Sequence, residues 1–217
     1  MTRRAGDARV LVPELLDSLP VNDPGAIRSR ADLRRLDVFM GNSRWVLQRL
    51  AAAEQSWGSF LELGAGDGRL CSLIASRWRD KLISGWDFVA RPAGLDQRVN
   101  WRGGDFLQAG DLGCPDVCSG ALILHHFGSD ELLRLGERLR VVRRLLFVEP
   151  VRHRLPLLLS MFASPFLGRV TRHDMRASIR AGFLPGELGP ALGLPGDWKT
   201  KETAAFRGAL RFEAWRI

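Results

Sequence analysis

Three glycines at alternate positions, with carboxylates beside them, are the first residues of this chain that could do chemistry. They lie in the stretch FLELGAGDGRL, residues 60–70. Its glycines and acids are Glu62, Gly64, Gly66, Asp67 and Gly68. Glycine tolerates positive φ angles and lets a ligand touch the backbone. Because two carboxylates repel a phosphate but attract a cation, the spacing predicts a turn that binds a positively charged ligand.

Two more carboxylates close later strand-like segments. Asp87 ends LISGWD, and Asp105 follows WRGG and precedes Phe106. A carboxylate at the end of a parallel strand can accept hydrogen bonds from both hydroxyls of a ribose or from the amino group of an adenine. We therefore expect Asp87 to bind a ribose, and Asp105 and Phe106 to bind an adenine.

Three histidines are candidate proton acceptors. His125 and His126 follow an apolar strand-like segment, and His173 lies near the start of a later helix. Histidine titrates near neutrality and can remove a proton from a hydroxyl group. In an extended chain, adjacent side chains point to opposite sides, so His125 and His126 could not both face one site. A helix cap for one of the pair and a surface position for His173 are the alternatives.

The elements that must position these residues alternate between strands and helices. We expect strands at residues 59–63, 81–87, 98–101, 116–124 and 143–149, and helices at 69–78 and 129–139, the latter capped by Ser129. This order predicts an α/β fold, a Rossmann-like doubly wound sheet with helices on both faces. Two late strands, at 198–203 and 210–217, should add an antiparallel C-terminal hairpin to the otherwise parallel sheet.

The flanking segments are predicted to be helical. Ser29 and Asp32 resemble a capping box at the start of a helix over residues 31–53, with a break near Gly41. Thr171 is the expected N-cap of a later helix. The chain should form a single domain, residues 1–217. Its expected parts are an N-terminal helical extension at 1–55, a ligand-binding core at 56–150, and a lid segment with C-terminal strands at 151–217.

Taken together, these motifs resemble the class I S-adenosylmethionine (SAM) methyltransferases. The matching pieces are LELGAGDG, the acid Asp87, GDF, and DVCSGALILHHF, within residues 58–150, with a looser match at AGF, residues 181–183. The resemblance implies SAM as cofactor. It also implies that the glycine turn with Glu62 holds the amino acid part of SAM, that Asp87 holds the ribose and that Asp105 holds the adenine.

The LHHF stretch resembles the ubiquinone/menaquinone-type and other small-molecule methyltransferases. The same stretch lacks the Asn/Asp-Pro-Pro-aromatic signature of amino-nitrogen methylation, which favours an oxygen or carbon acceptor. We expect a small hydrophobic acceptor, either a phenol or quinol or a polyketide-like compound. The apolar residues 155–168 are predicted to form a lid over this acceptor. They could instead form a membrane contact beside Arg152, Arg154 and Arg169, or an ordinary buried helix.

The charge balance keeps a second class of function open. The net charge is +8, and all but three of the 32 basic residues are arginine. An excess of positive charge favours anionic partners, so an rRNA or tRNA methyltransferase is the alternative function. A non-catalytic SAM-binding interaction subunit is a third hypothesis. An NAD-linked reductase is disfavoured because the third glycine is misplaced and the chain has no tyrosine.

The cysteines predict neither a metal site nor disulfides. Cys114 and Cys118 could be paired with His125 and His126, but no second CxxC motif or matching histidine pair completes a zinc site. Three cysteines without a disulfide-like spacing suit a reducing compartment. The N-terminal stretch has no signal-peptide pattern, and we expect a cytoplasmic protein.

Overall fold

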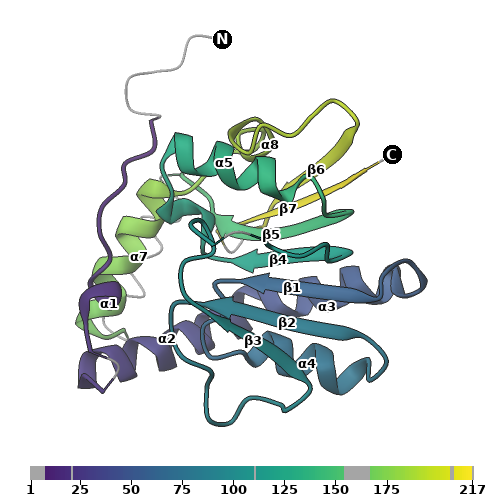
Figure 1. Ribbon diagram of the computed structural model, residues 1–217. Coiled ribbons are helices and arrows are strands. Elements are labelled where there is room, and N and C mark those ends of the chain that lie inside the picture. Colours follow the sequence, from purple (N-terminus) through teal and green to yellow (C-terminus); the bar gives the residue numbers. More distant parts are fainter. Residues whose placement is uncertain (1–7, 21, 110, 154–166, 206–207, 217) are drawn as a thin grey trace.

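The computed structural model describes residues 8–20, 22–109, 111–153, 167–205 and 208–216, which form one seven-stranded sheet (Figure 1). Its order is β3-β2-β1-β4-β5-β7-β6. The strands are β1 (Ser59–Leu63), β2 (Leu82–Asp87), β3 (Val99–Gly103), β4 (Val117–Ala121), β5 (Arg144–Pro150), β6 (Trp198–Ala204) and β7 (Ala209–Arg216). The first five are parallel, and β7 is antiparallel to both of its neighbours. The predicted sheet is confirmed.

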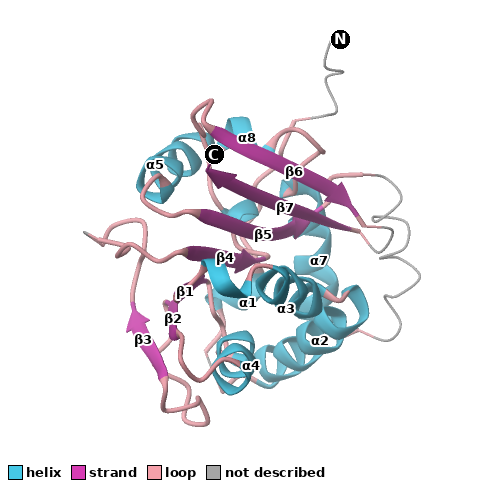
Figure 2. Cartoon of the chain, turned by 90° about the vertical axis from the view of Figure 1, so that its right-hand side faces the viewer, coloured by secondary structure: helices cyan, strands magenta, loops and turns pink. Residues whose placement is uncertain are grey.

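Helices cover both faces of this sheet (Figure 2). They are α1 (Leu15–Ser18), α2 (Pro24–Met40), α3 (Asn42–Ala52), α4 (Arg69–Arg77), α5 (Ser129–Leu139), α7 (Arg169–Ala181) and α8 (Leu188–Ala191), with the 3-10 turns η1 (Glu54–Ser56) and η2 (Leu124–His126). Helices α3 and α4 pack on one face, and α5 and α8 pack on the other. Figure 1 shows α1, α2 and α7 on the side to which the parallel strands point.

Successive side chains of β1 point to opposite faces of the sheet and pack in two separate hydrophobic clusters. Phe60 packs with residues of α3 and α4, whereas Leu61 and Leu63 pack with the leucines of α5. All three side chains are buried. Because successive side chains of a strand point to opposite faces, a short apolar run with both faces covered is the expected pattern for a central parallel strand.

The N-terminal helix begins earlier than predicted, and the capping box is wrong. Asp23 caps α2, because its carboxylate accepts hydrogen bonds from the amides of Gly25 and Ala26. Asp32 is instead buried inside the helix, where it accepts bonds from the Gly168 amide and the Thr171 hydroxyl. The predicted break at Gly41 is confirmed by a φ of 69°.

Two other helix caps also differ from the prediction. The N-cap of α7 is Gly168, and Thr171 is a buried residue of its first turn. The N-cap of α5 is Gly128 rather than Ser129, and its amide donates to the Glu131 carboxylate at 2.8 Å. In both places a glycine precedes the residue whose side chain suggested a cap, so a rule based on side chains chose the wrong position.

The predicted apolar lid lies almost entirely outside the described residues, which resume at residue 167. Its role stays a prediction. Within the ranges that the structure describes, no helix combines the length and apolar character needed to cross a lipid bilayer.

Candidate active site

The glycine turn after β1 has the backbone geometry that its sequence predicts. Gly64, Gly66 and Gly68 have φ angles of 65°, 57° and 69°. A Cβ atom at Gly64 would lie 2.8 Å from Ile123, and one at Gly68 would lie 2.4 Å from Leu95. Nothing lies within 4 Å of a Cβ atom at Gly66. Two of the glycines are therefore required by packing, and the third faces open space where a ligand can approach.

Asp87 joins this turn to the ends of two neighbouring strands. Its Oδ2 accepts a hydrogen bond of 2.7 Å from the Gly66 amide, and its Oδ1 accepts one of 3.1 Å from Val89. Its carbonyl accepts from Gly104 at 3.0 Å. Because each carboxylate oxygen can accept more than one bond, Asp87 keeps acceptor capacity for two ligand hydroxyls.

Asp105 and Phe106 follow β3, where the sequence places them. The Asp105 carboxylate is half-buried and accepts a bond of 2.7 Å from the Leu107 amide. Phe106 is buried, and its ring meets that of Phe127 edge-on, with centroids 5.6 Å apart. In this structure the ring belongs to the core beneath the turn, and its contact with an adenine stays a prediction.

Glu62 lies behind the glycine turn rather than in an open pocket. Its side chain is buried and accepts a bond of 3.0 Å from the Cys71 thiol. Burial raises the pKa of Glu62 to about 8, and the nearby carboxylates of Asp67 and Asp87 also raise it. The carboxyl group therefore holds a proton at neutral pH, and a cation bound at the turn would favour its ionisation.

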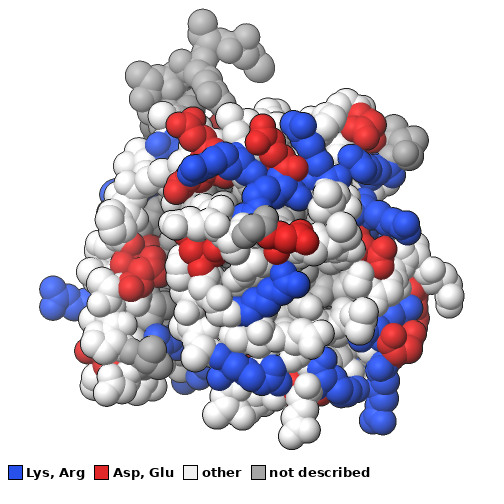
Figure 3. Space-filling view, in the orientation of Figure 1, with Lys and Arg blue, Asp and Glu red and all other residues white. Residues whose placement is uncertain are grey.

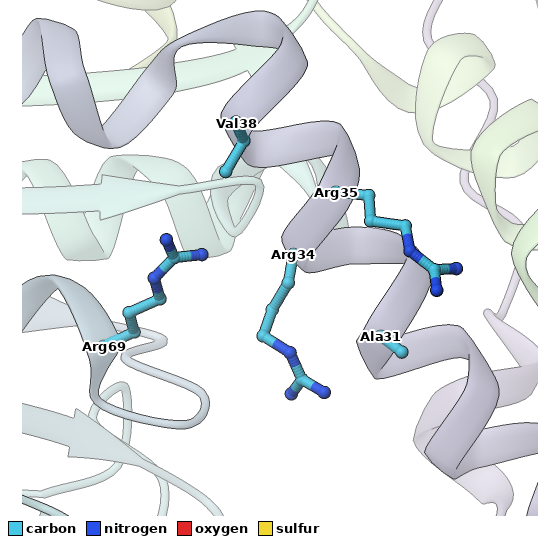
Figure 4. A pocket seen from close by; sticks show the side chains of 5 residues that line it. All are labelled: Ala31, Arg34, Arg35, Val38 and Arg69. Atoms are coloured by element: carbon cyan, nitrogen blue, oxygen red, sulfur yellow. The ribbon is translucent and has the colours of Figure 1, made fainter.

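Helix α2 reaches over the glycine turn. Arg34 forms an ion pair with Asp67 at 3.3 Å. A groove of about 510 Å³ separates α2 from the start of α4, and it is lined by Ala31, Arg34, Arg35, Val38 and Arg69 (Figure 4). In this view Arg34 and Arg69 extend into the gap from the two helices. The N-terminal extension thus contacts the predicted cofactor side of the domain, and Val38 and Phe39 of α2 are exposed.

The turn after β4 brings both adjacent histidines to one place. Residues 124–126 form a 3-10 turn, so the chain is not extended here and the condition that would separate the two side chains does not hold. The two imidazole rings lie 4.3 Å apart at an angle of 35°. Ile123, just before them, packs against Gly64, so this turn adjoins the glycine turn.

Glu149 at the end of β5 organises this turn. Its fully buried carboxylate accepts hydrogen bonds from the amides of Ile123, Leu124 and His125, at 3.0, 2.8 and 3.2 Å. It also lies 2.8 Å from Nδ1 of His125. A single buried carboxylate therefore fixes both the backbone of η2 and the orientation of one histidine.

His125 is buried between two carboxylates. Nδ1 faces Glu149, and Nε2 lies 3.3 Å from Oε1 of Glu14. Burial by itself would lower the pKa of His125, but the hydrogen bonds to Glu14 and Glu149 outweigh it and raise the pKa to about 9. His126 is more exposed, and its Nδ1 lies 3.6 Å from Asp17. We call Glu14, Asp17, His125 and His126 the His cluster.

The two acids of the His cluster come from a segment that the sequence did not single out. Residues 8–18, here called the N-terminal strap, lie along α7 and cover η2. The amides of Leu15 and Leu16 donate to the Asp174 carboxylate at 2.7 and 3.0 Å. The sequence signal for this arrangement was weak, since PELLD shows only two acids in an apolar stretch.

His173 does not join this cluster. Its side chain is exposed, and Nδ1 lies 3.0 Å from Asp174. Of the three predicted candidate bases, the structure thus brings two together and leaves the third on the outer side of α7. Asp174, beside it, holds the N-terminal strap in place.

Solved methyltransferase structures share this fold. The plantazolicin methyltransferase BpumL, in complex with a triazolic desmethylPZN analog and SAH, has a TM-score of 0.70 at 12% identity, over 89% of this chain and 92% of that one. Human N-acetylserotonin methyltransferase in complex with SAM has a TM-score of 0.61 at 17% identity, over 98% of this chain and 63% of that one. Magnesium protoporphyrin IX methyltransferase (ChlM) from Synechocystis PCC 6803 with bound SAH has a TM-score of 0.61 at 16% identity, over 91% and 96%.

Neither a protein-family model nor a curated protein matches the sequence. The match to these methyltransferases is therefore one of structure, and it extends over nearly the whole chain. The chain has the fold of the class I SAM-dependent methyltransferases.

Proposed function

We propose that this protein is a SAM-dependent methyltransferase that acts on a small hydrophobic acceptor. The observation that carries the proposal is the link between Asp87 and Gly66. An acid at the end of β2 is hydrogen-bonded to the one glycine of the turn that faces open space. A nucleoside placed there would meet a carboxylate for its hydroxyls and a bare backbone for its amino acid part.

Different residues near the glycine turn are proposed to bind different parts of SAM. Asp87 accepts from the ribose hydroxyls and Asp105 from the adenine amino group. Asp67 and Glu62 place negative charge near the cationic amino acid part and the sulfonium. The groups that hold the donor thus lie at the carboxyl ends of β1, β2 and β3.

The acceptor is proposed to bind beside the His cluster. Methyl transfer breaks the sulfur–carbon bond of SAM and forms a bond from carbon to an oxygen or carbon atom of the acceptor. A hydroxyl acceptor must lose a proton, and the His cluster offers imidazole and carboxylate groups to receive it. The contact of Ile123 with Gly64 makes the cluster a direct neighbour of the donor turn.

A small acceptor, phenolic, quinol or polyketide-like, is supported by the neighbours in structure. The three compared above are named as methyltransferases of plantazolicin, of N-acetylserotonin and of magnesium protoporphyrin IX. None of these names is that of a nucleic acid. The sequence argument for an oxygen or carbon acceptor is independent of this comparison.

A calorimetric titration with SAM and S-adenosylhomocysteine tests the cofactor proposal. Asp87→Ala should weaken binding about 10- to 100-fold, since a hydrogen bond to a charged group contributes about 1.5–3 kcal/mol. Asp96→Ala is the matched control, because Asp96 is a nearby acid that is paired with Arg98. The proposal fails if the wild-type protein binds neither compound, or if both variants bind as the wild type does.

We propose a surface for the membrane contact that differs from the one suggested by the sequence, whose apolar segment lies almost entirely outside the described residues. Arg152 is not available, because its guanidinium is bonded to both carboxylate oxygens of Glu187. Arg154 lies outside the described residues. Arg169 instead lines a groove of about 470 Å³ beside α7, together with Val12, Arg172, His173, Arg176, Ala177 and Arg180. We propose this groove as the surface for an anionic membrane.

A cytoplasmic location remains part of the proposal. Cys71, Cys114 and Cys118 are all free thiols in the structure. Free cysteines suit a reducing compartment.

A further inference from the structure

Two imidazoles and one carboxylate meet where the N-terminal strap crosses η2. Glu14, His125 and His126 each offer one ligand atom, and these atoms all lie within 4.8 Å of one another. The exposed fraction of the side chain is 2% for His125, 13% for Glu14 and 27% for His126. The cluster is thus closed at His125 and open toward solvent at His126.

The separation of His125 Nε2 from Glu14 Oε1 suits a shared cation. Nε2 of His125 lies 3.3 Å from Glu14 Oε1, whereas a hydrogen bond between an imidazolium and a carboxylate is about 2.7–2.9 Å. The bond from His125 Nδ1 to Glu149 has that shorter length, 2.8 Å. Two ligands of a tetrahedral zinc ion, each about 2.0–2.1 Å from the metal, lie about 3.3 Å apart.

Hydrogen bonds from neighbouring residues fix the orientation of His125 and Glu14, as is usual for side chains that bind a metal ion. Nδ1 of His125 faces the buried Glu149, so Nε2 is the ring nitrogen that faces Glu14. A carboxylate on the far nitrogen of an imidazole increases the basicity of the ligand nitrogen. Glu14 also accepts a hydrogen bond from the Ser178 hydroxyl. Of the three potential ligands, His125 is therefore held by a residue of β5 and Glu14 by a residue of α7.

We propose that Glu14, His125 and His126 bind a divalent transition-metal ion of the zinc type. Two imidazoles and a carboxylate leave one position of such an ion open. The cysteines considered from the sequence take no part, since neither belongs to the cluster and Cys118 is buried in β4.

The role of the ion rests on the proposed methyl transfer. An acceptor hydroxyl bound at the open position would lose its proton more readily, because the cation stabilises the oxygen anion. The proton passes to Asp17, which lies beside His126. The oxygen anion then attacks the methyl carbon of SAM as the sulfur–carbon bond breaks, and the products are the methyl ether and S-adenosylhomocysteine.

The test uses full-length protein that has been dialysed against a chelator and then titrated with Zn²⁺, and in parallel with Co²⁺. We expect one equivalent of Zn²⁺ per chain and visible absorption bands for bound Co²⁺. Glu14→Gln and His126→Gln should each weaken Zn²⁺ binding at least tenfold. These two positions are preferred to His125, because His125 is buried against Glu149 and its loss could unfold the turn.

His173→Gln is the matched control, since His173 is a histidine next to an acid but lies outside the cluster. Its Zn²⁺ affinity should equal that of the wild type. Binding of S-adenosylhomocysteine, measured for every variant, reports folding and tests the cofactor proposal separately. The metal proposal is overturned if the wild type binds neither ion, or if the double variant Glu14→Gln/His126→Gln binds Zn²⁺ as tightly as the wild type.

Discussion

At the scale of single residues, the buried carboxyl group of Glu62 makes the stability of the protein depend on pH. Its pKa of about 8 lies above the ordinary value of 4.5, so the folded state holds the proton more tightly than the unfolded state. Stability should therefore fall as the pH rises from about 5 to about 8, by up to about 1.4 kcal/mol per pH unit. Chemical denaturation of the wild type and of Glu62→Gln across this range measures the effect.

The variant should lose this part of the pH dependence and become the more stable protein at pH 8–9. Parallel curves for the two proteins would contradict the assignment. Because Glu62 is expected to ionise when a cation binds, SAM binding should also release protons. Calorimetry in buffers with different ionisation enthalpies counts these protons, and Glu62→Gln should release fewer of them.

Substitution of two glycines of the turn distinguishes a packing role, expected for Gly68, from a role in ligand contact, expected for Gly66. In Gly68→Ala the new Cβ atom would meet Leu95 at 2.4 Å and hold a positive φ angle, so we expect a loss of about 2–3 kcal/mol of stability. In Gly66→Ala the Cβ atom has free space, and the positive φ angle alone should cost about 1 kcal/mol. Thermal denaturation measures both losses, and the melting temperature should fall further in Gly68→Ala than in Gly66→Ala.

Affinity for S-adenosylhomocysteine should be reduced in Gly66→Ala by more than its small loss of stability explains, because the new methyl group occupies the space left for the ligand. Gly193→Ala is a control, as Gly193 has a φ of 56° and lies in the turn after α8, away from this loop. If Gly66→Ala bound the ligand as well as Gly193→Ala does, the open space at Gly66 would not be a binding surface.

At the scale of elements, the N-terminal strap supplies the two carboxylates of the His cluster. Arg9 holds it, since its guanidinium donates to the carbonyls of His125, Phe127 and Ala181 and lies 4.2 Å from the centroid of the Phe183 ring. Arg9→Ala should lower stability by about 2 kcal/mol and increase proteolysis of the strap. It should reduce methyl transfer while leaving affinity for S-adenosylhomocysteine nearly unchanged.

Arg44→Ala provides the comparison, because Arg44 is an exposed arginine of α3. It should affect neither property. Equal losses of methyl transfer and of cofactor affinity in Arg9→Ala would show that the strap supports the whole domain rather than the acceptor side.

Elements with a local signal could be predicted from the sequence, and those built by distant contacts could not. Short apolar runs that alternate with helical segments predicted the strands and the sheet class, and the spacing of Gly64, Gly66 and Gly68 predicted the turn. The His cluster could not be predicted, because Glu14 lies 111 residues from His125 in the sequence. No local pattern reports a contact across that separation.

The turn after β4 also could not be predicted from the local sequence. The run of apolar residues up to Leu124 has the pattern of a strand, but the chain leaves the strand at Leu122, which has a φ of 56°. The Glu149 carboxylate, about 25 residues later, supplies the acceptors that replace strand bonds for the next amides. A tertiary hydrogen bond decided the conformation there, and with it the orientation of both histidines.

At the scale of the whole molecule, one local concentration of positive charge lies along α7. On the face shown in Figure 3, basic and acidic side chains are interspersed. Four arginines of α7 instead line the groove beside Val12, and in the described part of the chain none of them forms an ion pair. They are Arg169, Arg172, Arg176 and Arg180. An unneutralised stripe of this kind is typical of a surface for anions.

The groove predicts binding to vesicles that contain an anionic lipid. Arg172→Glu/Arg176→Glu should reduce co-sedimentation with such vesicles at least tenfold, because attraction near the surface is about 1 kcal/mol per basic residue and both charges are reversed. Arg134→Glu on α5, combined with Arg140→Glu directly after this helix, makes the same change in net charge elsewhere. If both double variants lost binding equally, net charge and not the groove would be responsible. Titration of the same proteins with tRNA addresses the alternative acceptor, since an RNA substrate would bind tightly with a steep salt dependence that the α7 variant reduces.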